Sequence, residues 1–133
     1  MNIVMLGHKI VPSRDGGVEI VVEELATRMA ALNNEVTLIN RRRKDSKHTE
    51  YKNIKIIDAF TINKKSLDAI VYAYTATKLA KKIAKKENVD VIHFHAEGPC
   101  AFLRKIPKKN KRKYKVVVTI HGLDWHVIYY IKI

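Results

Sequence analysis

Short apolar runs alternate along the chain with segments in which apolar residues recur every three or four positions. The apolar runs predict buried β-strands over 2–7, 35–40, 53–57, 90–95 and 115–120. The periodic segments predict amphipathic helices over 18–32 and about 66–86, and residues 97–106 predict a short helical or irregular link. Strands separated by helices pair in parallel through right-handed crossovers. The pattern therefore predicts an α/β fold, a Rossmann-like doubly wound parallel sheet with strand order 3-2-1-4-5.

Two further expectations concern the longer helix. Ser66 precedes its first turn and is expected to cap its N-terminus. Its core face is expected to consist of its larger apolar residues, which are Leu67, Ile70, Val71, Tyr74, Leu79 and Ile83.

In a sheet wound this way, ligands bind beyond the carboxyl ends of the strands, at the point where the winding direction reverses. Here that point lies between the first and fourth predicted strands. The segments that follow strands one, four and five are 7–17, 95–98 and 121–124. They are rich in glycine, histidine and carboxylate groups. We expect them to meet, so that Gly17, His95 and His121 border one crevice.

The composition fits a single globular domain, with 133 residues of which 47% are hydrophobic. The single cysteine, Cys100, excludes an intrachain disulfide and a cysteine-rich zinc site, and is expected to be a buried spectator and not a nucleophile. No apolar run approaches the ~18–20 residues that span a bilayer. The N-terminus lacks the features of a signal peptide. Together these observations predict a cytoplasmic protein.

Positive charge dominates, with 26 Lys and Arg against 13 Asp and Glu, for a formal net charge of +13. The cations cluster at 41–44 and 104–115, and at helical spacing over 78–86. Such charge attracts anionic lipid, phosphorylated small molecules or nucleic acid, and it also suits a solvated lysine-rich surface. Only Tyr114 interrupts the basic runs with an aromatic ring, and no nucleic-acid-binding motif is present. Specific nucleic-acid binding is therefore not expected.

Gly16 and Gly17 directly precede the first predicted helix. Adjacent glycines let a ligand approach the backbone, and a helix N-terminus offers free N–H groups to a phosphate. A turn that needs positive φ explains the same pair equally well. The pair does not form the G-x-G-x-x-G fingerprint, and Asn40 and Arg41 stand where a dinucleotide-binding protein needs an acidic ribose-binding residue. We therefore expect neither NAD nor another resident cofactor.

Three histidines are candidates for the chemistry of the crevice. His93 and His95 share one face of the fourth predicted strand, and His121 follows the fifth. They suggest a three-imidazole metal site, packed structural histidines, or imidazoles that exchange hydrogen bonds with ligand hydroxyl groups. Because no supporting pattern around them can be read from the sequence, we expect no metal there.

These motifs, in this order and spacing, resemble the N-terminal domain of retaining family 4 glycosyltransferases, which have the GT-B fold. The matching segments are 16–26, 35–38, 90–95 and 117–125, and the resemblance covers residues 1–126. It implies two Rossmann-like domains that face each other across a cleft. The N-terminal domain binds the acceptor, and the C-terminal domain holds the nucleotide-sugar donor. Transfer then retains the anomeric configuration without a catalytic metal.

The resemblance also implies roles for individual residues. Gly16 and Gly17 would bring N–H groups to the donor diphosphate, and His121, the expected catalytic residue, would contact the transferred sugar. The residues that would line the acceptor and sugar pocket are His95, Glu97 and Asp124. The acceptor is expected to be a glycan or a lipid-linked glycan. The basic surface would suit a peripheral position on the anionic inner face of a membrane.

Members of this family are much longer than this chain. Residues 1–126 are therefore expected to be the acceptor-side domain alone, without the domain that holds the donor. Residues 127–133 form an atypical apolar tail that does not continue the family pattern, as a truncated or frame-shifted gene would give. We expect the isolated chain to be inactive as a transferase. The alternative is a non-catalytic basic α/β module that binds a partner or an anionic membrane.

Overall fold

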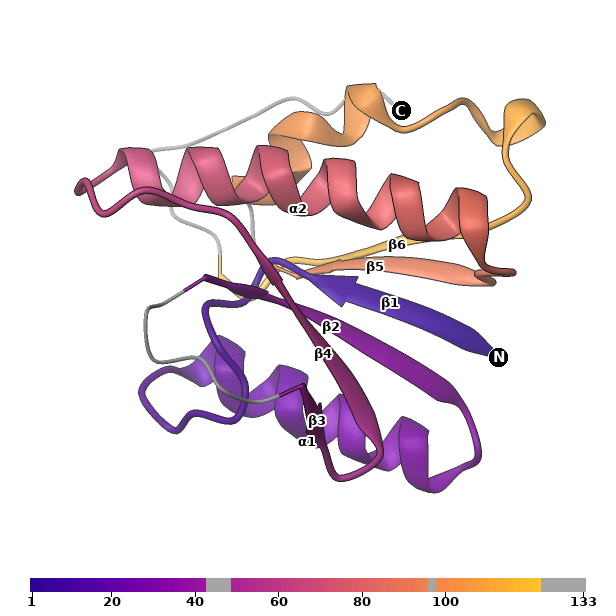
Figure 1. Cartoon of the computed structure of the whole chain (residues 1–133), viewed down its shortest axis with the longest axis horizontal. Coiled ribbons are helices and arrows are strands. Elements are labelled where there is room, and N and C mark those ends of the chain that lie inside the picture. Colours follow the sequence, from indigo (N-terminus) through magenta and orange to yellow (C-terminus); the bar gives the residue numbers. More distant parts are fainter. Residues whose placement is uncertain (43–48, 96–97, 123–133) are drawn as a thin grey trace.

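A six-stranded sheet lies between two helical layers in this computed structural model, which describes residues 1–42, 49–95 and 98–122. The strands are β1 (Asn2–Leu6), β2 (Glu35–Arg41), β3 (Glu50–Tyr51), β4 (Ile54–Ala59), β5 (Val91–His95) and β6 (Lys115–Thr119). The helices are α1 (Gly17–Ala31), α2 (Leu67–Lys86) and two 3-10 helices, η1 (Gly98–Lys105) and η2 (Lys109–Lys111). Helix α1 covers one face of the sheet, and α2 covers the other together with η1 (Figure 1).

The five longer strands confirm the predicted fold. They pair in parallel in the order β4-β2-β1-β5-β6, which is the predicted order 3-2-1-4-5. The sheet has one further strand, β3, which pairs antiparallel with β4 at the edge. Lys52 and Asn53 join these two strands with φ angles of 46° and 62°, as in a type I′ hairpin turn. A strand of two residues is too short to show any periodicity, so the sequence pattern missed it.

Alternate residues of β1 point into two separate cores, because side chains alternate across a strand. Ile3 and Met5 belong to the core under α1, and Val4 and Leu6 belong to the core under α2. The α1 core is completed chiefly by Val11, Val22, Ala26, Val36, Leu38 and Ile54. The α2 core is completed chiefly by Ile39, Tyr72, Ala76, Ala80, Ile92 and Phe94. Both faces of β1 are therefore dry, as a central parallel strand requires.

Helix α2 packs on the sheet through a face that matches the predicted one only in part. Ile83 is buried and Leu79 packs against the core, as predicted, but Leu67, Ile70 and Tyr74 are 47%, 56% and 40% exposed. The buried residues are Tyr72, Ala73, Ala76, Thr77, Ala80 and Ile83.

Tyr72 decides which face is buried. Its hydroxyl donates to the Ile39 carbonyl at 2.6 Å and accepts the Gly7 N–H at 3.0 Å, so this side chain must point into the sheet. That requirement brings the small alanines onto the strands and turns Leu67, Ile70 and Tyr74 outward.

The start of α2 also differs from the expectation. Ser66 makes no capping hydrogen bond with its side chain, and its φ angle is 71°. The predicted cap is therefore wrong. In the described part of the chain, no helix is both long enough and apolar enough to cross a bilayer.

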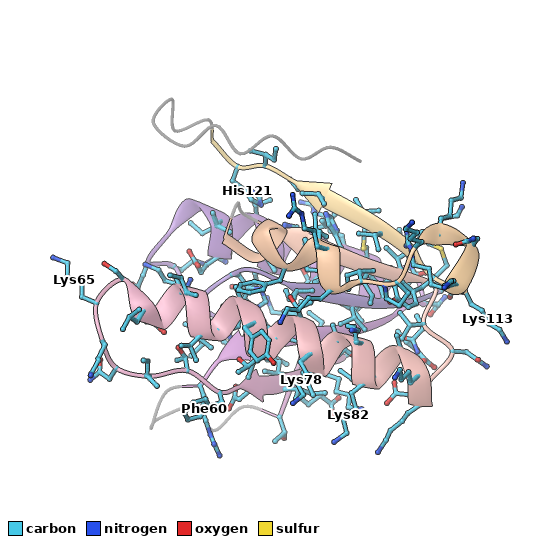
Figure 2. The ribbon with its side chains drawn as sticks, turned by 90° about the horizontal axis from the view of Figure 1, so that it is seen from above. Phe60, Lys65, Lys78, Lys82, Lys113 and His121 are labelled. Atoms are coloured by element: carbon cyan, nitrogen blue, oxygen red, sulfur yellow. The ribbon has the colours of Figure 1, made fainter. Side chains whose placement is uncertain are left out.

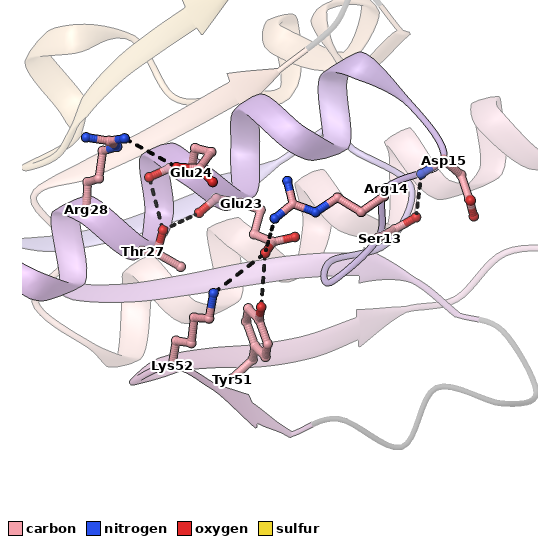
Figure 3. A network of polar contacts seen from close by, with 9 residues as sticks. All are labelled: Ser13, Arg14, Asp15, Glu23, Glu24, Thr27, Arg28, Tyr51 and Lys52. Carbon is pink, nitrogen blue, oxygen red and sulfur yellow. Dashed lines mark hydrogen bonds and ion pairs between the residues drawn. The ribbon is translucent and has the colours of Figure 1, made fainter.

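A buried carboxylate joins α1 to β3 and to the loop before α1 (Figure 3). Oε1 of Glu23 accepts a hydrogen bond from the Tyr51 hydroxyl at 3.0 Å. Arg14 Nη2 and Lys52 Nζ lie 3.7 Å and 4.0 Å from the same oxygen. The loop that contains Arg14 leads into Gly16, so this network helps to position the N-terminus of α1.

Candidate functional site

The candidate site lies at the edge of the sheet where the parallel strands end and α1 begins (Figure 1). Gly7, the residue after β1, has a φ angle of 115°. A Cβ atom on Gly7 would lie 1.6 Å from the carbonyl oxygen of His95. Only glycine tolerates both the left-handed backbone and this close approach. Gly7 therefore lets the ends of β1 and β5 come together, as a crevice at the winding reversal requires.

Three histidine rings form a row beside this point. His95 pairs with Thr119 across β5 and β6, which brings His121, two residues further on, alongside His95. Nδ1 of His95 and Nε2 of His121 are 3.0 Å apart, and their ring centroids are 5.3 Å apart. The His93 ring lies 4.0 Å from the His95 ring, and its Nε2 is 2.7 Å from the Thr119 hydroxyl. The structure thus joins His95 and His121 directly, as the strand order predicts.

His95 is the most enclosed member of this row. It is fully buried, and its Nε2 atom has no hydrogen-bond partner in the described part of the chain. The pKa of His95 is lowered to about 3, chiefly by burial and to a smaller extent by the nearby His93, His121 and His8. Burial also lowers the pKa of His93. Both imidazoles are therefore neutral at pH 7, and a neutral imidazole can donate one hydrogen bond and accept another.

A fourth histidine, His8, was not among the predicted site residues. It is fully buried behind the row, and its Nε2 lies 2.7 Å from Asn40 Oδ1. The Asn40 side chain also accepts the Val11 N–H at 3.2 Å and donates to the Val11 carbonyl at 2.9 Å, which fixes the amide orientation. An amide oxygen can only accept, so Nε2 of His8 carries the proton. The sequence signal that could have identified His8 as a site residue is its position directly after Gly7, at the end of the first strand.

His8 remains uncharged for the same reason as His95. Burial lowers its pKa to about 4, against a smaller opposing effect from the hydrogen bond to Asn40. Its Nδ1 atom is buried without a hydrogen-bond partner among the described residues. The buried imidazoles of His8, His93 and His95 are therefore all neutral hydrogen-bonding groups at pH 7.

The two glycines before α1 differ in what surrounds them. Gly16 is the N-cap with an extended backbone (φ −157°, ψ 152°), and a Cβ atom on it would lie 2.2 Å from Glu19 Oε2. Gly17 begins the helix, and a Cβ atom there would meet no atom of the described residues within 4 Å. Neither glycine has positive φ, so the alternative of a positive-φ turn is wrong. Gly17 instead leaves the N-terminus of α1 open to approach.

Glu19 connects this helix N-terminus to the end of β1. Its Oε1 accepts the backbone N–H of Lys9 at 2.9 Å. Lys9 lies two residues after Gly7, whose backbone approaches the His95 carbonyl. The chain of contacts therefore runs from the Gly16–Gly17 segment through Glu19 and residues 7–9 to the histidine row.

Some of the predicted residues cannot be placed. Glu97 and Asp124 lie outside the described residues, as do Trp125 and the apolar tail 127–133. The roles predicted for Glu97 and Asp124 therefore stay predictions. Nothing is described of the side chain of Cys100 either. Within the described residues, no group of three or more His, Cys, Asp or Glu side chains is arranged to hold a metal ion.

Three comparisons with known proteins each cover most of the chain, and each matches it to glycosyltransferases. Residues 15–132 match the family model described as Glycosyltransferase Family 4. An uncharacterized glycosyltransferase of Methanocaldococcus jannaschii is 28% identical over 109 residues, which are 82% of this chain and 29% of that protein. The crystal structure of a glycosyltransferase from Rickettsia africae superimposes with a TM-score of 0.58 at 22% identity, covering 92% of this chain and 30% of that one. The chain thus spans about 30% of the length of these relatives.

Proposed function

The chain belongs to Glycosyltransferase Family 4, and from this premise we propose that it is the acceptor-side domain of a retaining glycosyltransferase. The complete enzyme would transfer a sugar from a nucleotide-sugar donor to a glycan or lipid-linked acceptor. It would do so without a catalytic metal or a resident cofactor. The C-terminal domain that holds most of the donor would lie in the length of the relatives that this chain does not span.

The observation that carries this proposal is the chemistry of one sheet edge. The open N-terminus of α1 at Gly17 offers backbone N–H groups, which suit the charge of a donor diphosphate. The neutral imidazole of His95 and the adjoining ring of His121 suit sugar hydroxyl groups, which both donate and accept. One edge thus combines a site for the leaving group with a site for the sugar.

His121 would act at the transferred sugar. Its Nε2 is held by His95 Nδ1, which fixes the orientation of the ring. The other ring nitrogen, Nδ1, would then meet a sugar hydroxyl and hold it as positive charge develops at the anomeric carbon. Glu97 and Asp124 would complete the pocket from the segments that follow β5 and His121.

Binding of a nucleoside diphosphate tests the donor side of this proposal. The Gly17→Asp variant places a carboxylate at the open N-terminus of α1, where it would repel a diphosphate. We expect the dissociation constants for UDP and GDP, measured from backbone amide shifts by NMR, to rise by about tenfold or more. The matched control is Leu32→Asp, which adds the same charge at an exposed position beyond the other end of the helix. Equal weakening in both variants would contradict the proposed site.

We place the expected contact with an anionic membrane on the solvent face of α2. The side chains on this face form a single stripe, which is apolar in the first two turns of the helix and basic in the last three. The stripe consists of Leu67, Ile70, Tyr74, Lys78, Lys82 and Lys85. Phe60 is 53% exposed, and Figure 2 shows it on the same side of the molecule as Lys78 and Lys82. Apolar side chains that enter the headgroup layer next to lysines are typical of helices that lie on membranes.

This surface would place the enzyme at the cytoplasmic face of a membrane, close to a lipid-linked acceptor. It is also the observation that favours the second candidate function, a non-catalytic basic module bound to membranes. Nucleoside diphosphate binding that depends on Gly17 separates the two functions, because only the transferase needs it.

Vesicle sedimentation tests the membrane contact. We expect binding to phosphatidylglycerol vesicles, little binding to phosphatidylcholine vesicles, and about tenfold weaker binding by a Leu67→Ser, Ile70→Ser double variant. Val21→Ser removes an apolar side chain of similar exposure (46%) from α1 and should bind as the parent chain does. Unchanged binding by the α2 variant would rule out this face.

A further inference from the structure

A cavity of about 380 Å³ lies at the edge of the sheet where the strands begin, away from the histidine row. The end of α2, the residues before β5, and the η2 segment before β6 surround it. Lys113 precedes β6 and His121 follows it, and the five residues of β6, at about 3.3 Å each, hold the two ends roughly 15 Å apart or more. Figure 2 shows Lys113 at one end of the molecule and His121 well separated from it.

The lining of this cavity is strongly basic. Its cations are Lys81, Lys85, Lys111, Arg112 and Lys113. Its two carboxylates are engaged elsewhere, since Glu87 Oε1 lies 3.6 Å from Lys55 Nζ and Asp90 Oδ2 accepts the Asn2 N–H at 2.7 Å. Among the described residues, none of the five cations forms an ion pair. With five cations against two carboxylates, the cavity therefore carries an excess of positive charge.

Arg112 is the one cation of the cavity that the fold holds in place. Its Nη1 donates to the Tyr114 carbonyl at 2.8 Å, and its guanidinium carbon lies 5.5 Å from the centre of the Tyr114 ring. Its Nε is buried and has no hydrogen-bond partner in the described part of the chain. A buried donor without a partner destabilises the fold. An oxygen atom of an anionic ligand would supply the missing partner.

Apolar groups form the rest of the lining, which distinguishes the cavity from an open lysine-rich surface. They are Ala84, Val89, Pro107 and the ring of Tyr114. The volume falls within the range of roughly 300–1,000 Å³ that small-molecule sites occupy. A ligand that fits such a cavity has a compact group of high negative charge and a small apolar part.

We propose that this cavity is a second anion site, which binds a phosphate ester. Arg112 would donate hydrogen bonds to two phosphate oxygens, as a guanidinium does, and the lysine ammonium groups would neutralise the remaining charge. A free phosphorylated small molecule and the headgroup of a phospholipid share this chemistry. The site contains none of the residues assigned to sugar transfer, so it goes beyond the proposed function and does not depend on it.

Calorimetric titration of the 133-residue chain tests the proposal with two probes. Pyrophosphate represents a free phosphorylated molecule, and dihexanoyl phosphatidate below its micellar concentration represents a lipid headgroup. The cavity variant combines Lys85→Gln, Arg112→Gln and Lys113→Gln. The matched control removes three charges at exposed positions outside both the cavity and the proposed membrane stripe: Lys64→Gln, Lys65→Gln and Arg104→Gln. We expect binding to weaken by at least about tenfold in the cavity variant and by less than about twofold in the control.

Two further variants make the result decisive. Arg112→Lys keeps the charge but removes the Nε donor, so binding should weaken although the fold and net charge are retained. Gly17→Asp acts at the proposed donor site on the opposite edge, so it should weaken only the pyrophosphate binding that the cavity variant retains. Stronger cavity-dependent binding of phosphatidate identifies a lipid headgroup, and stronger binding of pyrophosphate identifies a free phosphate ester. Equal weakening in the cavity variant and its charge-matched control, or no saturable binding of either probe, would overturn the proposal.

Discussion

Single buried polar groups hold the ends of β1 and β2 in place. The Tyr72 hydroxyl joins the Gly7 N–H to the Ile39 carbonyl, and the Asn40 side chain joins His8 to the Val11 backbone. Each of these groups would lie unpaired in the core if its partner were removed. The strand ends beside the histidine row are therefore fixed by hydrogen bonds as well as by packing.

The Tyr72→Phe substitution tests this support at one residue. It leaves the Gly7 N–H without its side-chain partner and keeps almost all of the packing, so we expect the free energy of unfolding to fall by about 1–3 kcal/mol. The measurement is urea denaturation followed by circular dichroism. Tyr74→Phe is the matched control, because Tyr74 lies in the same helix but is 40% exposed. A loss of equal size in both variants would contradict a special role for Tyr72.

The buried histidines predict how stability depends on pH. The folded-state pKa of His8 is lowered to about 4, and that of His95 to about 3, whereas an unfolded histidine titrates near 6.5. The fold therefore favours the neutral forms, so this stability is fully present above about pH 6.5 and is lost as the pH falls toward 4. We expect the free energy of unfolding to drop between pH 6.5 and 4.5 by up to about 2–3 kcal/mol per buried histidine.

Urea denaturation at half-unit steps of pH measures this loss. A His8→Gln variant should be less stable at pH 7 but should have a shallower pH dependence, by up to one bound proton. A parent chain whose stability does not change between pH 6.5 and 4.5 would contradict the burial of these imidazoles as neutral groups.

At the scale of elements, the alternation of apolar runs and helical periods was enough to predict the five parallel strands and their order. Right-handed crossovers leave few other arrangements. The same pattern could not select the buried face of α2. That helix has two possible faces, one of large apolar residues and one of alanines with Tyr72, and a hydrogen bond made by Tyr72 across the fold decides between them. Such a contact has no counterpart in periodicity.

A single carboxylate, that of Glu23, joins the edge strand β3 to helix α1. Glu23 is buried under the hairpin and accepts the Tyr51 hydroxyl, while Arg14 and Lys52 approach it from solvent with side chains 63% and 59% exposed (Figure 3). We expect Glu23→Gln to lower the free energy of unfolding by about 1–2 kcal/mol, because the Tyr51 hydroxyl loses a charged acceptor. The exposed cations contribute little to that loss.

The matched control for this network is Glu24→Gln. Glu24 is the next residue in the helix, and its ion pair with Arg28 is on the surface, so its loss should cost under about 0.5 kcal/mol. Amide hydrogen exchange at Ile56, whose N–H donates to the Thr49 carbonyl, reports on the hairpin directly. Faster exchange at Ile56 in Glu23→Gln and not in Glu24→Gln is the expected result.

At the scale of the molecule, strand order alone predicted that the segments after β5 and β6 would meet. The contact between His95 and His121 follows from the pairing of His95 with Thr119. Sequence could not show that His8 lies buried behind them, because that depends on how tightly β1 and β5 approach at Gly7. Nor could it show the basic cavity at the other edge, where residues from α2 and η2 are brought together only by the fold.

The proposed two-domain enzyme leads to a last expected outcome. The chain spans about 30% of the length of its relatives, and the proposed donor-binding domain would lie in the part that these 133 residues do not span. If these residues are tested alone, the donor would be held by few contacts, and its reacting carbon would not be positioned against an acceptor. We therefore expect the purified 133-residue chain to release no more nucleoside diphosphate from UDP-sugars or GDP-sugars than a His121→Ala variant does. Turnover clearly above that background would show that this chain holds a complete active site, and it would place the donor within the residues described by this fold.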